Sequence, residues 1–328
     1  MNKIKLSIIL LALFTAAIYP QMYLTEQPFA NTFSVVARDP VTGEIGAAVQ
    51  SHWFNVGAVV IWGEAGVGVI ATQSFVNVSF GIRGLELLKS GLTPKQVVDS
   101  LIGSDEGRDF RQLAVLDPKG NSAAYTGKKC VADAGHLNGE NYSVQANLMI
   151  SNKVWPSMEK AFKESSGPLA ERLIAVLEAA QKEGGDIRGK QSAAILIFKG
   201  TSTGKPWEDK LIDLRVDDNP DPIVELKRLL KVQRAYDHMN NGDLAVEKND
   251  MQKAMFEYSS AEKMFPDNEE MKFWHAVTLI NKDQKEEGYK ILKEVFSLNK
   301  NYRTLIPRII KSDLLHVNQD EQQKIMNL

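Results

Sequence analysis

Thr32 stands at the start of a stretch, 32–39, whose side chains alternate as in a β-strand, with Phe33, Val35 and Ala37 on one face. A threonine at the first position of a processed chain can act as an N-terminal nucleophile, because its hydroxyl attacks a carbonyl carbon while its own α-amine takes the proton. An unperturbed α-amine has a pKa of roughly 7.7–8.0, so it can accept a proton near neutral pH. Thr32 is therefore the candidate nucleophile and base of an amide hydrolase. The alternative is a threonine that only favours the strand.

Amide hydrolysis also requires a donor to the oxyanion and groups that hold the substrate. Asn147, on a predicted strand, is the candidate oxyanion donor, because its amide N–H₂ would be rigid and uncharged there. It could equally bond its own strand edge. Glu64 and Arg83 are candidates to orient the α-amine or to bind a charged group of the substrate, and the alternative for each is an ordinary salt bridge.

A polar, glycine-rich loop, 184–192, runs directly into an apolar strand. Loops in that position commonly carry functional side chains, which makes Asp186 and Arg188 candidates for substrate binding. A purely structural clasp of the loop is the alternative. Gln73 and Gln191 are expected to line the same cleft.

His136 is the one histidine in a distinctive setting, and we consider it a substrate contact or a hydrogen-bonded structural residue. It has no second ligand at the spacing of a metal site, such as H-E-x-x-H or C-x-x-C, and the chain has no phosphate-binding loop. The sequence therefore predicts neither a metal nor a cofactor. The single cysteine, Cys130, cannot form an intramolecular disulfide and is expected to be half-buried.

The composition is that of an ordinary globular protein, with 44% hydrophobic and 24% charged residues. A net charge of −2 gives no electrostatic reason to expect nucleic-acid binding. Lys3 and Lys5 precede an uncharged, mostly apolar run, 6–18, which is shorter than the roughly 20 residues of a spanning helix. We expect a signal peptide over 1–21, with a cut that could fall as late as 31. The expected mature protein is exported, periplasmic or extracellular, without a stable membrane anchor.

The periodicity predicts a layered α+β domain over 32–216. Two strands, 32–39 and 45–50, form a hairpin around a turn at 39–44. Further strands are expected at 56–62, 67–73, 112–117, 122–125, 143–150, 193–198 and 211–216. Helices are expected at 79–90, 93–102, 155–164 and 168–182, the second of them opened by Thr93, Pro94 and Gln96 as a capping box. Strand runs separated by helix pairs indicate two sheets with helices outside.

A stretch with two prolines and three aspartates, 217–222, reads as a boundary, and the pattern over 223–328 is helical throughout. A helix is expected to begin at 241–243. The next helix carries small and aromatic residues at the spacing of a tetratricopeptide repeat, closing on a proline: Ala254, Tyr258, Ala261 and Pro266. A second unit, 34 residues on, would use Ala276, Gly288, Leu292 and Val295. An ordinary helical bundle is the alternative.

Taken together, 32 to about 200 resembles a bacterial family known as domain of unknown function 1028. The matching segments are T-F-S-V-V-A-R-D-P (32–40), V-G-A-V-V (56–60), E-A-G-V-G (64–68), A-T-Q (71–73), R-G-L-E-L-L (83–88), A-G-H (134–136), Q-A-N (145–147) and G-D-I-R-G-K-Q-S-A (185–193). That family is assigned to the Ntn-hydrolase superfamily. The resemblance implies the four-layer αββα sandwich of that superfamily and supports Thr32 as nucleophile. Members look as if they begin at or just before this threonine, whereas here 29–31 precede it, so a peptidase or self-cleavage must act after Asn31.

Two functions follow from these expectations. The first is an exported amidohydrolase that acts on a small amide or peptide-like substrate through Thr32. The second is a binding protein without catalysis, in which the helical repeats present a concave surface to a protein or peptide partner. The sequence leaves the oligomeric state open and is compatible with a homo-oligomer.

Overall fold

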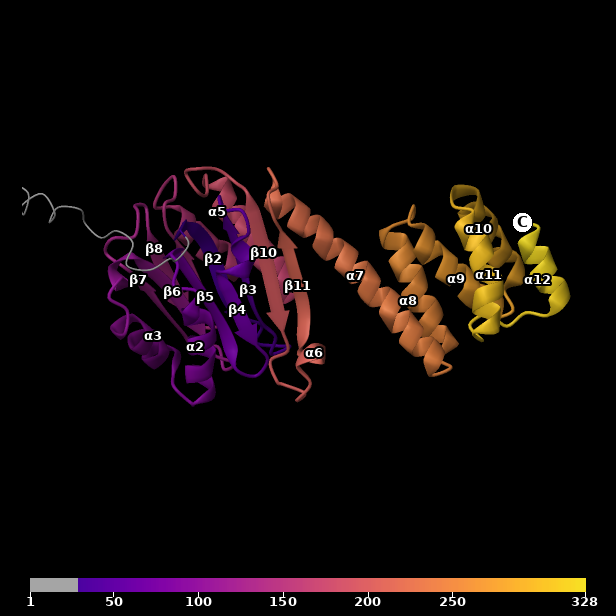
Figure 1. Cartoon of the computed structure of the whole chain (residues 1–328), viewed down its shortest axis with the longest axis horizontal. Coiled ribbons are helices and arrows are strands. Elements are labelled where there is room, and N and C mark those ends of the chain that lie inside the picture. Colours follow the sequence, from indigo (N-terminus) through magenta and orange to yellow (C-terminus); the bar gives the residue numbers. More distant parts are fainter. Residues whose placement is uncertain (1–28) are drawn as a thin grey trace, which may run out of the picture. The chain divides into compact units, whose positions relative to one another are not determined.

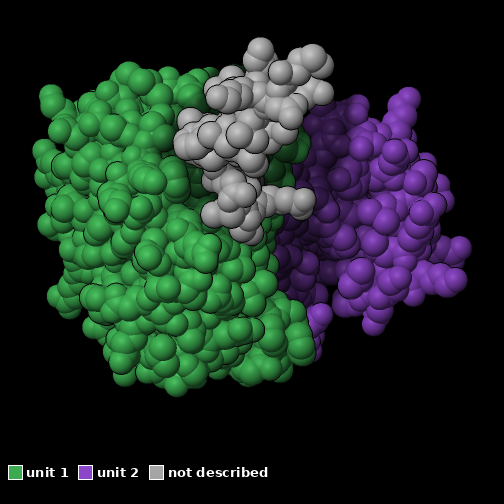
Figure 2. Space-filling model, turned by 60° about the vertical axis from the view of Figure 1, so that its left-hand side comes forward, with its two compact units in different colours: residues 1–227 green, residues 228–328 purple. Residues whose placement is uncertain are grey.

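The computed structural model describes residues 29–328, so the predicted signal peptide lies outside the described residues. The chain forms two compact units, Met1–Lys227 and Arg228–Leu328, which are coloured separately in Figure 2. Within the described residues, no helix is both long enough and apolar enough to cross a membrane.

The first unit holds two antiparallel sheets (Figure 1). The first sheet is built in the order β1-β5-β6-β7, with β4 beside β5: β1 (Phe29–Ala30), β4 (Ile61–Glu64), β5 (Gly68–Phe75), β6 (Arg111–Leu116) and β7 (Ser122–Thr126). The second has the order β11-β10-β3-β2-β9-β8: β2 (Thr32–Arg38), β3 (Ile45–Ser51), β8 (Gly135–Gly139), β9 (Tyr142–Ala146), β10 (Ser192–Phe198) and β11 (Lys210–Val216). The candidate nucleophile thus opens a strand inside the second sheet.

Each sheet is covered by one pair of helices on its outer side. Helices α2 (Ser79–Lys89) and α3 (Pro94–Gly103) contact the first sheet, and α4 (Val154–Glu164) and α5 (Leu169–Lys182) contact the second. The capping box of α3 forms as expected, with the Thr93 hydroxyl accepting from the Gln96 N–H. Between the sheets lies an apolar core that includes Val36, Val69 and Leu196. The expected mixture of helices with two antiparallel sheets is confirmed.

The alternation of β2 decides which of its side chains face the other sheet. Val36 belongs to the core between the sheets, and Ser34 hydrogen-bonds to Gln73 on β5. Because side chains alternate along a strand, Thr32 lies on this same face, toward the first sheet. The face with Phe33 is turned to the side that α5 covers.

Three elements of the structure differ from the prediction. Val56–Ala58 is a 3₁₀ turn capped by the Asn55 side chain, so the strand predicted over 56–62 begins only at Ile61. The strand predicted over 143–150 ends at Ala146, because Leu148 adopts a left-handed conformation with φ of 59°. β8 was not expected, since glycine and asparagine are poor strand formers and only pairing with β9 defines it.

The second unit is helical. It contains the end of α7 (Pro222–Glu247) followed by α8 (Met251–Met264), α9 (Glu269–Asn281), α10 (Lys285–Leu298), α11 (Asn301–Lys311) and α12 (Gln319–Met326). The expectation of a helix start at 241–243 is wrong, because this stretch continues α7 and Gly242 packs against the Tyr258 ring. Two apolar clusters form the core, one around Tyr258 and one around Phe273 and Leu292.

Equivalent positions recur in this unit 34 residues apart. Asn249 and Asp283, with φ of 55° and 66°, lie in the turns that follow α7 and α9. The small residues Gly242 and Ala276 sit in those two helices at the same offset. Positions 34 residues apart in the sequence therefore occupy the same places relative to the ends of α7 and α9.

Candidate active site

The chain passes from one sheet to the other at Asn31. Just before it, Phe29 and Ala30 pair with Phe75 and Ser74 of β5 in the first sheet. Just after it, β2 begins in the second sheet. The peptide bond that must be cut to free the Thr32 amine is therefore held by secondary structure on both sides.

Two side chains donate to the carbonyl oxygen of Asn31. The Ser51 hydroxyl lies 2.5 Å from it and Nη2 of Arg188 lies 2.9 Å from it. Asp186 fixes the guanidinium through Nε at 3.0 Å and Nη2 at 2.7 Å, and its carboxylate is fully buried. The backbone N–H groups of Arg188 and His52 also donate to that carboxylate. A charged, preorganised donor and a hydroxyl thus meet at the carbonyl that precedes Thr32.

The carbonyl oxygen of Thr32 itself is bound by a different set of donors. It accepts from the backbone N–H of Asn147 at 3.1 Å, from Nε2 of Gln73 at 3.2 Å and from Nδ2 of Asn147 at 3.4 Å. Thr32, Gln73 and Asn147 are all fully buried. The Asn147 amide therefore holds the backbone of Thr32, whereas Ser51 and Arg188 hold the carbonyl in front of it.

Gln112 connects these groups and was not singled out by the sequence. Its Oε1 accepts from Gln73 at 2.6 Å and from Asn147 at 2.9 Å, and its Nε2 donates to the Ala146 carbonyl at 2.9 Å. Gln73 lies on β5, whereas Ala146 ends β9 and Asn147 follows it, and Gln112 is fully buried. The available signal is a glutamine next to the apolar run 113–116, because a polar side chain beside a buried strand indicates a buried polar network.

His136 reaches this network through a single hydroxyl. Its Nδ1 lies 2.8 Å from Oγ1 of Thr126, which in turn accepts from Gln112 at 2.9 Å. Burial lowers the pKa of the imidazole, so the neutral ring is favoured. His136 also lines a pocket of about 560 Å³ together with Lys128, Trp155 and neighbouring residues of 126–135.

Three of the residues expected in the site lie elsewhere. Glu64 pairs with Lys89 at 2.6 Å and stands opposite Gly68, at the far end of β5 from Gln73. The Gln191 side chain donates to Asp218, although its backbone N–H bonds to the Ser51 carbonyl. Arg83 donates to the Ser104 hydroxyl at 3.0 Å.

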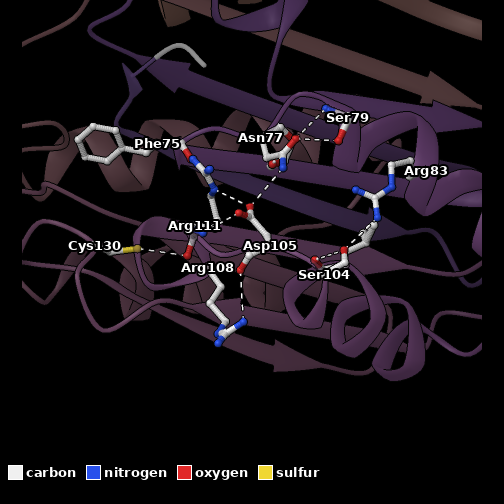
Figure 3. A network of polar contacts seen from close by, with 12 residues as sticks. Phe75, Asn77, Ser79, Arg83, Ser104, Asp105, Arg108, Arg111 and Cys130 are labelled. Carbon is white, nitrogen blue, oxygen red and sulfur yellow. Dashed lines mark hydrogen bonds and ion pairs between the residues drawn. The ribbon is translucent and has the colours of Figure 1, made fainter. Parts of the chain in front are cut away.

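A second polar network lies beside β5 (Figure 3). Arg111 forms an ion pair with Asp105 at 2.8 Å and donates to the Phe75 carbonyl at 2.5 Å. Burial alone would raise the pKa of Asp105, but hydrogen bonds from Arg111, Asn77 and Gly107 and the charge of Arg111 outweigh it and hold that pKa below its usual value. This network fixes the strand that pairs with residues 29–30.

Cys130 donates to the Arg111 carbonyl at 3.3 Å, and burial raises the pKa of its thiol. A neutral thiol is a poor nucleophile, so this environment disfavours nucleophilic chemistry at Cys130. Over residues 29–328, no three side chains of the metal-binding types gather into a site.

Comparisons with known proteins agree with the fold. A model of the family of unknown function DUF1028 matches residues 32–226. The crystal structure of protein SPO2555 from Silicibacter pomeroyi, described with the same family, is 33% identical. It superposes with a TM-score of 0.56 over 61% of this chain and 85% of that chain. No curated protein matches. Since the family model spans more than half of its length, this chain belongs to the DUF1028 family.

Proposed function

We propose that this protein is an N-terminal-nucleophile amidohydrolase whose nucleophile and base are the hydroxyl and α-amine of Thr32. The observation that carries the proposal is the pair of donors on the Asn31 carbonyl, Ser51 and Arg188. Donors aimed at the oxygen where negative charge develops are the largest single contribution to acyl-transfer catalysis in many enzymes. They occur here at the peptide bond that joins the candidate nucleophile to the preceding residue.

The chain must first be cut between Asn31 and Thr32. In the self-cleavage route, the Thr32 hydroxyl attacks the Asn31 carbonyl carbon and gives up its proton, and the negative oxygen forms between Ser51 and Arg188. The C–N bond then breaks, the Thr32 nitrogen takes the proton, and an ester remains. Water hydrolyses that ester and leaves the leader with a free carboxyl group. A peptidase acting after Asn31 would yield the same mature chain.

The mature site would then hydrolyse an amide in two steps. The α-amine of Thr32 takes the hydroxyl proton as the oxygen attacks the substrate carbonyl, and passes it to the leaving amine as the C–N bond breaks. Water attacks the resulting ester, again with the α-amine as base, and releases the acid. Ser51 and Arg188 would stabilise the oxyanion in both steps.

Asn147, Gln73 and Gln112 act in this proposal as positioning residues. They bind the carbonyl of Thr32 and one another, so they fix the backbone that carries the nucleophile. Asp186 holds the guanidinium of Arg188 in place. His136 would contact the substrate from its pocket or transmit its position to Gln112 through Thr126.

The arrangement of layers supports an assignment to the Ntn-hydrolase superfamily. A helix pair, two facing antiparallel sheets and a second helix pair follow the order of its four-layer sandwich. The threonine at the start of a strand in the second sheet, on the face toward the first sheet, suits a nucleophile that must reach a substrate between them. Together with the predicted signal peptide, this proposal places the enzyme outside the cytoplasm, in the periplasm or the extracellular space.

The helical unit favours a second activity, the binding of a protein or peptide partner. The 34-residue offset between the turns at Asn249 and Asp283 supports a tetratricopeptide-like stack. Ala254, Tyr258 and Ala261 are buried in α8, and Gly288, Leu292 and Val295 are buried in α10. This stack would recruit a partner to the amidohydrolase unit. Partner binding without catalysis is the alternative function of the protein.

A direct test compares Thr32→Ser with Thr32→Ala in chains that begin with Met followed by residue 32. Mass spectrometry must confirm that the Met has been removed. Turnover of a panel of small amides and peptides should persist at a reduced rate in the Ser variant. It should fall by about three orders of magnitude or more in the Ala variant, as for other residues of a catalytic unit. Equal turnover by the Ala variant and the wild type would exclude Thr32.

A further inference from the structure

The edge of β5 is shared by two different segments. Strand β4 covers its first part, with Ile61 opposite Ala71 and Glu64 opposite Gly68. The N–H of Thr72 bonds to the Val60 carbonyl. Since β6 occupies the other edge, the remaining edge at Ser74 and Phe75 is covered, among the described strands, by β1 alone, which is two residues long.

The two residues of β1, Phe29 and Ala30, also lie on the acyl side of the bond to be cut. They pair antiparallel with β5, Asn31 follows, and its carbonyl oxygen lies between Ser51 and Arg188. In any amide that acylates Thr32, the carbonyl must reach the same hydroxyl. Residues 29–31 therefore represent the acyl half of a substrate, bound in an extended conformation.

Cleavage after Asn31 changes how this segment is held. Before cleavage the segment is tethered to Thr32. Afterwards, within the part of the chain that the structure describes, two residue pairs with β5 and the contacts to the Asn31 carbonyl still hold it. Departure of the segment would uncover the edge of β5 at 74–75. An open strand edge is a template for another extended chain, which would bind by main-chain hydrogen bonds.

The Asn31 side chain indicates which residue the site accepts next to the scissile carbonyl. It is fully buried, and neither its Nδ2 nor its Oδ1 has a hydrogen-bond partner among the described residues. A buried amide without partners is disfavoured, and a buried charge without a partner is disfavoured much more. The space around the Asn31 side chain offers no hydrogen-bond partner from residues 29–328, so it suits an apolar side chain of similar volume, such as leucine, better than asparagine or glutamate.

We propose that the substrate is an extended peptide whose acyl side binds as an added strand on β5 at Ser74 and Phe75. Its scissile carbonyl lies between Ser51 and Arg188, and a medium-sized apolar residue precedes the cleaved bond. This inference rests on the proposed function, because Thr32 performs the cleavage. The C–N bond breaks, the acyl group passes to the Thr32 oxygen, and water releases the peptide acid.

The test uses the full chain from Thr32 and one chromogenic leaving amine. Acetylated Phe-Ala-Leu, Phe-Ala-Asn and Phe-Ala-Glu anilides are compared with the anilide of acetyl-leucine alone. A fourth tripeptide carries an N-methyl group on the alanine nitrogen, which removes one main-chain donor. The leucine tripeptide should have a kcat/KM at least about tenfold above the asparagine tripeptide. Its kcat/KM should also be about tenfold above those of the single-residue and N-methylated substrates. The glutamate tripeptide should have the lowest kcat/KM of all.

A binding measurement separates this inference from the proposed function. Fluorescently labelled Phe-Ala-Leu acid should bind the chain from Thr32 more tightly than its N-methylated form, and binding should persist in Thr32→Ala. Equal kcat/KM for single-residue and tripeptide anilides would overturn the inference while leaving amide hydrolysis intact. Failure to hydrolyse any anilide, with strand-dependent peptide binding retained, would overturn the proposed function and leave the peptide site. Failure of both measurements would overturn both.

Discussion

At the scale of residues, the site depends on donors that the structure brings to two successive carbonyl groups. Ser51 and Arg188 hold the carbonyl of Asn31, whereas Asn147 and Gln73 hold that of Thr32. In the proposed reaction, the first pair polarises the bond between Asn31 and Thr32, and the second keeps the nitrogen side of that bond in place. The two pairs should therefore respond differently to mutation.

Replacing Arg188 by Ala should slow hydrolysis of small amides by about 10²–10³-fold, the effect of losing one oxyanion donor. Rates would be measured on chains that begin at Thr32. Lys190→Ala is the matched control, because Lys190 lies on the same loop and pairs with Asp221 instead. It should keep the wild-type rate. A similar loss in both variants would mean that the loop, and not the Arg188 charge, is needed.

The ion pair between Asp105 and Arg111 makes stability depend on pH. The carboxyl pKa is lower in the folded state than in the unfolded chain, so the pair stabilises the fold above the unfolded pKa of about 3.9. That contribution is lost as the pH falls through the lower, folded pKa. Asp105→Asn should cost about 3 kcal/mol at pH 7, since Arg111 is left buried.

Urea unfolding at pH 7 and pH 3 measures this effect. The difference between Asp105→Asn and the wild type should shrink at the lower pH, where the wild-type carboxyl begins to take up its proton. Exposed Asp99→Asn, whose partner Lys95 is also exposed, should change stability by less than about 1 kcal/mol at either pH. A difference for Asp105→Asn that stays constant with pH would rule out the ion pair as its source.

At the scale of elements, the sequence predicts the helices and strands that depend on residues close together in the chain. The capping box of α3 and the β2–β3 hairpin depend on residues close together in the chain, and both formed as expected. β8 depends on pairing with β9, and the role of Gln112 depends on partners from both sheets, so neither has a local signal. The same reason explains why Ser51 was missed.

Thr93→Ala should cost the first unit about 1 kcal/mol, because the Gln96 N–H loses its side-chain acceptor. Chemical unfolding would measure this loss. Lys95→Ala on the same helix turn removes only an exposed ion pair and should cost less than about 0.5 kcal/mol. Equal costs for the two variants would show that the capping box contributes nothing beyond helix propensity.

At the scale of the whole molecule, the two units have separate apolar cores, so each should respond to mutation by itself. Gly288→Val should destabilise the helical unit by about 2 kcal/mol or more, because a Cβ there would lie 2.9 Å from the Ala276 carbonyl oxygen. Hydrogen exchange should speed up in α9 and α10 and stay unchanged in the two sheets. Exposed Lys290→Ala on the same helix is the control. Faster exchange throughout the sheets would contradict independent cores.

The proposed function requires a cut between Asn31 and Thr32, which creates the nucleophile. Intact-mass measurement with N-terminal sequencing of the full-length protein, purified after export from a bacterial host, tests it most directly. We expect a mature chain that begins at Thr32 and has a free α-amine. A stable mature chain that begins at or before residue 31 would contradict it, because Thr32 would then have no amine to serve as base.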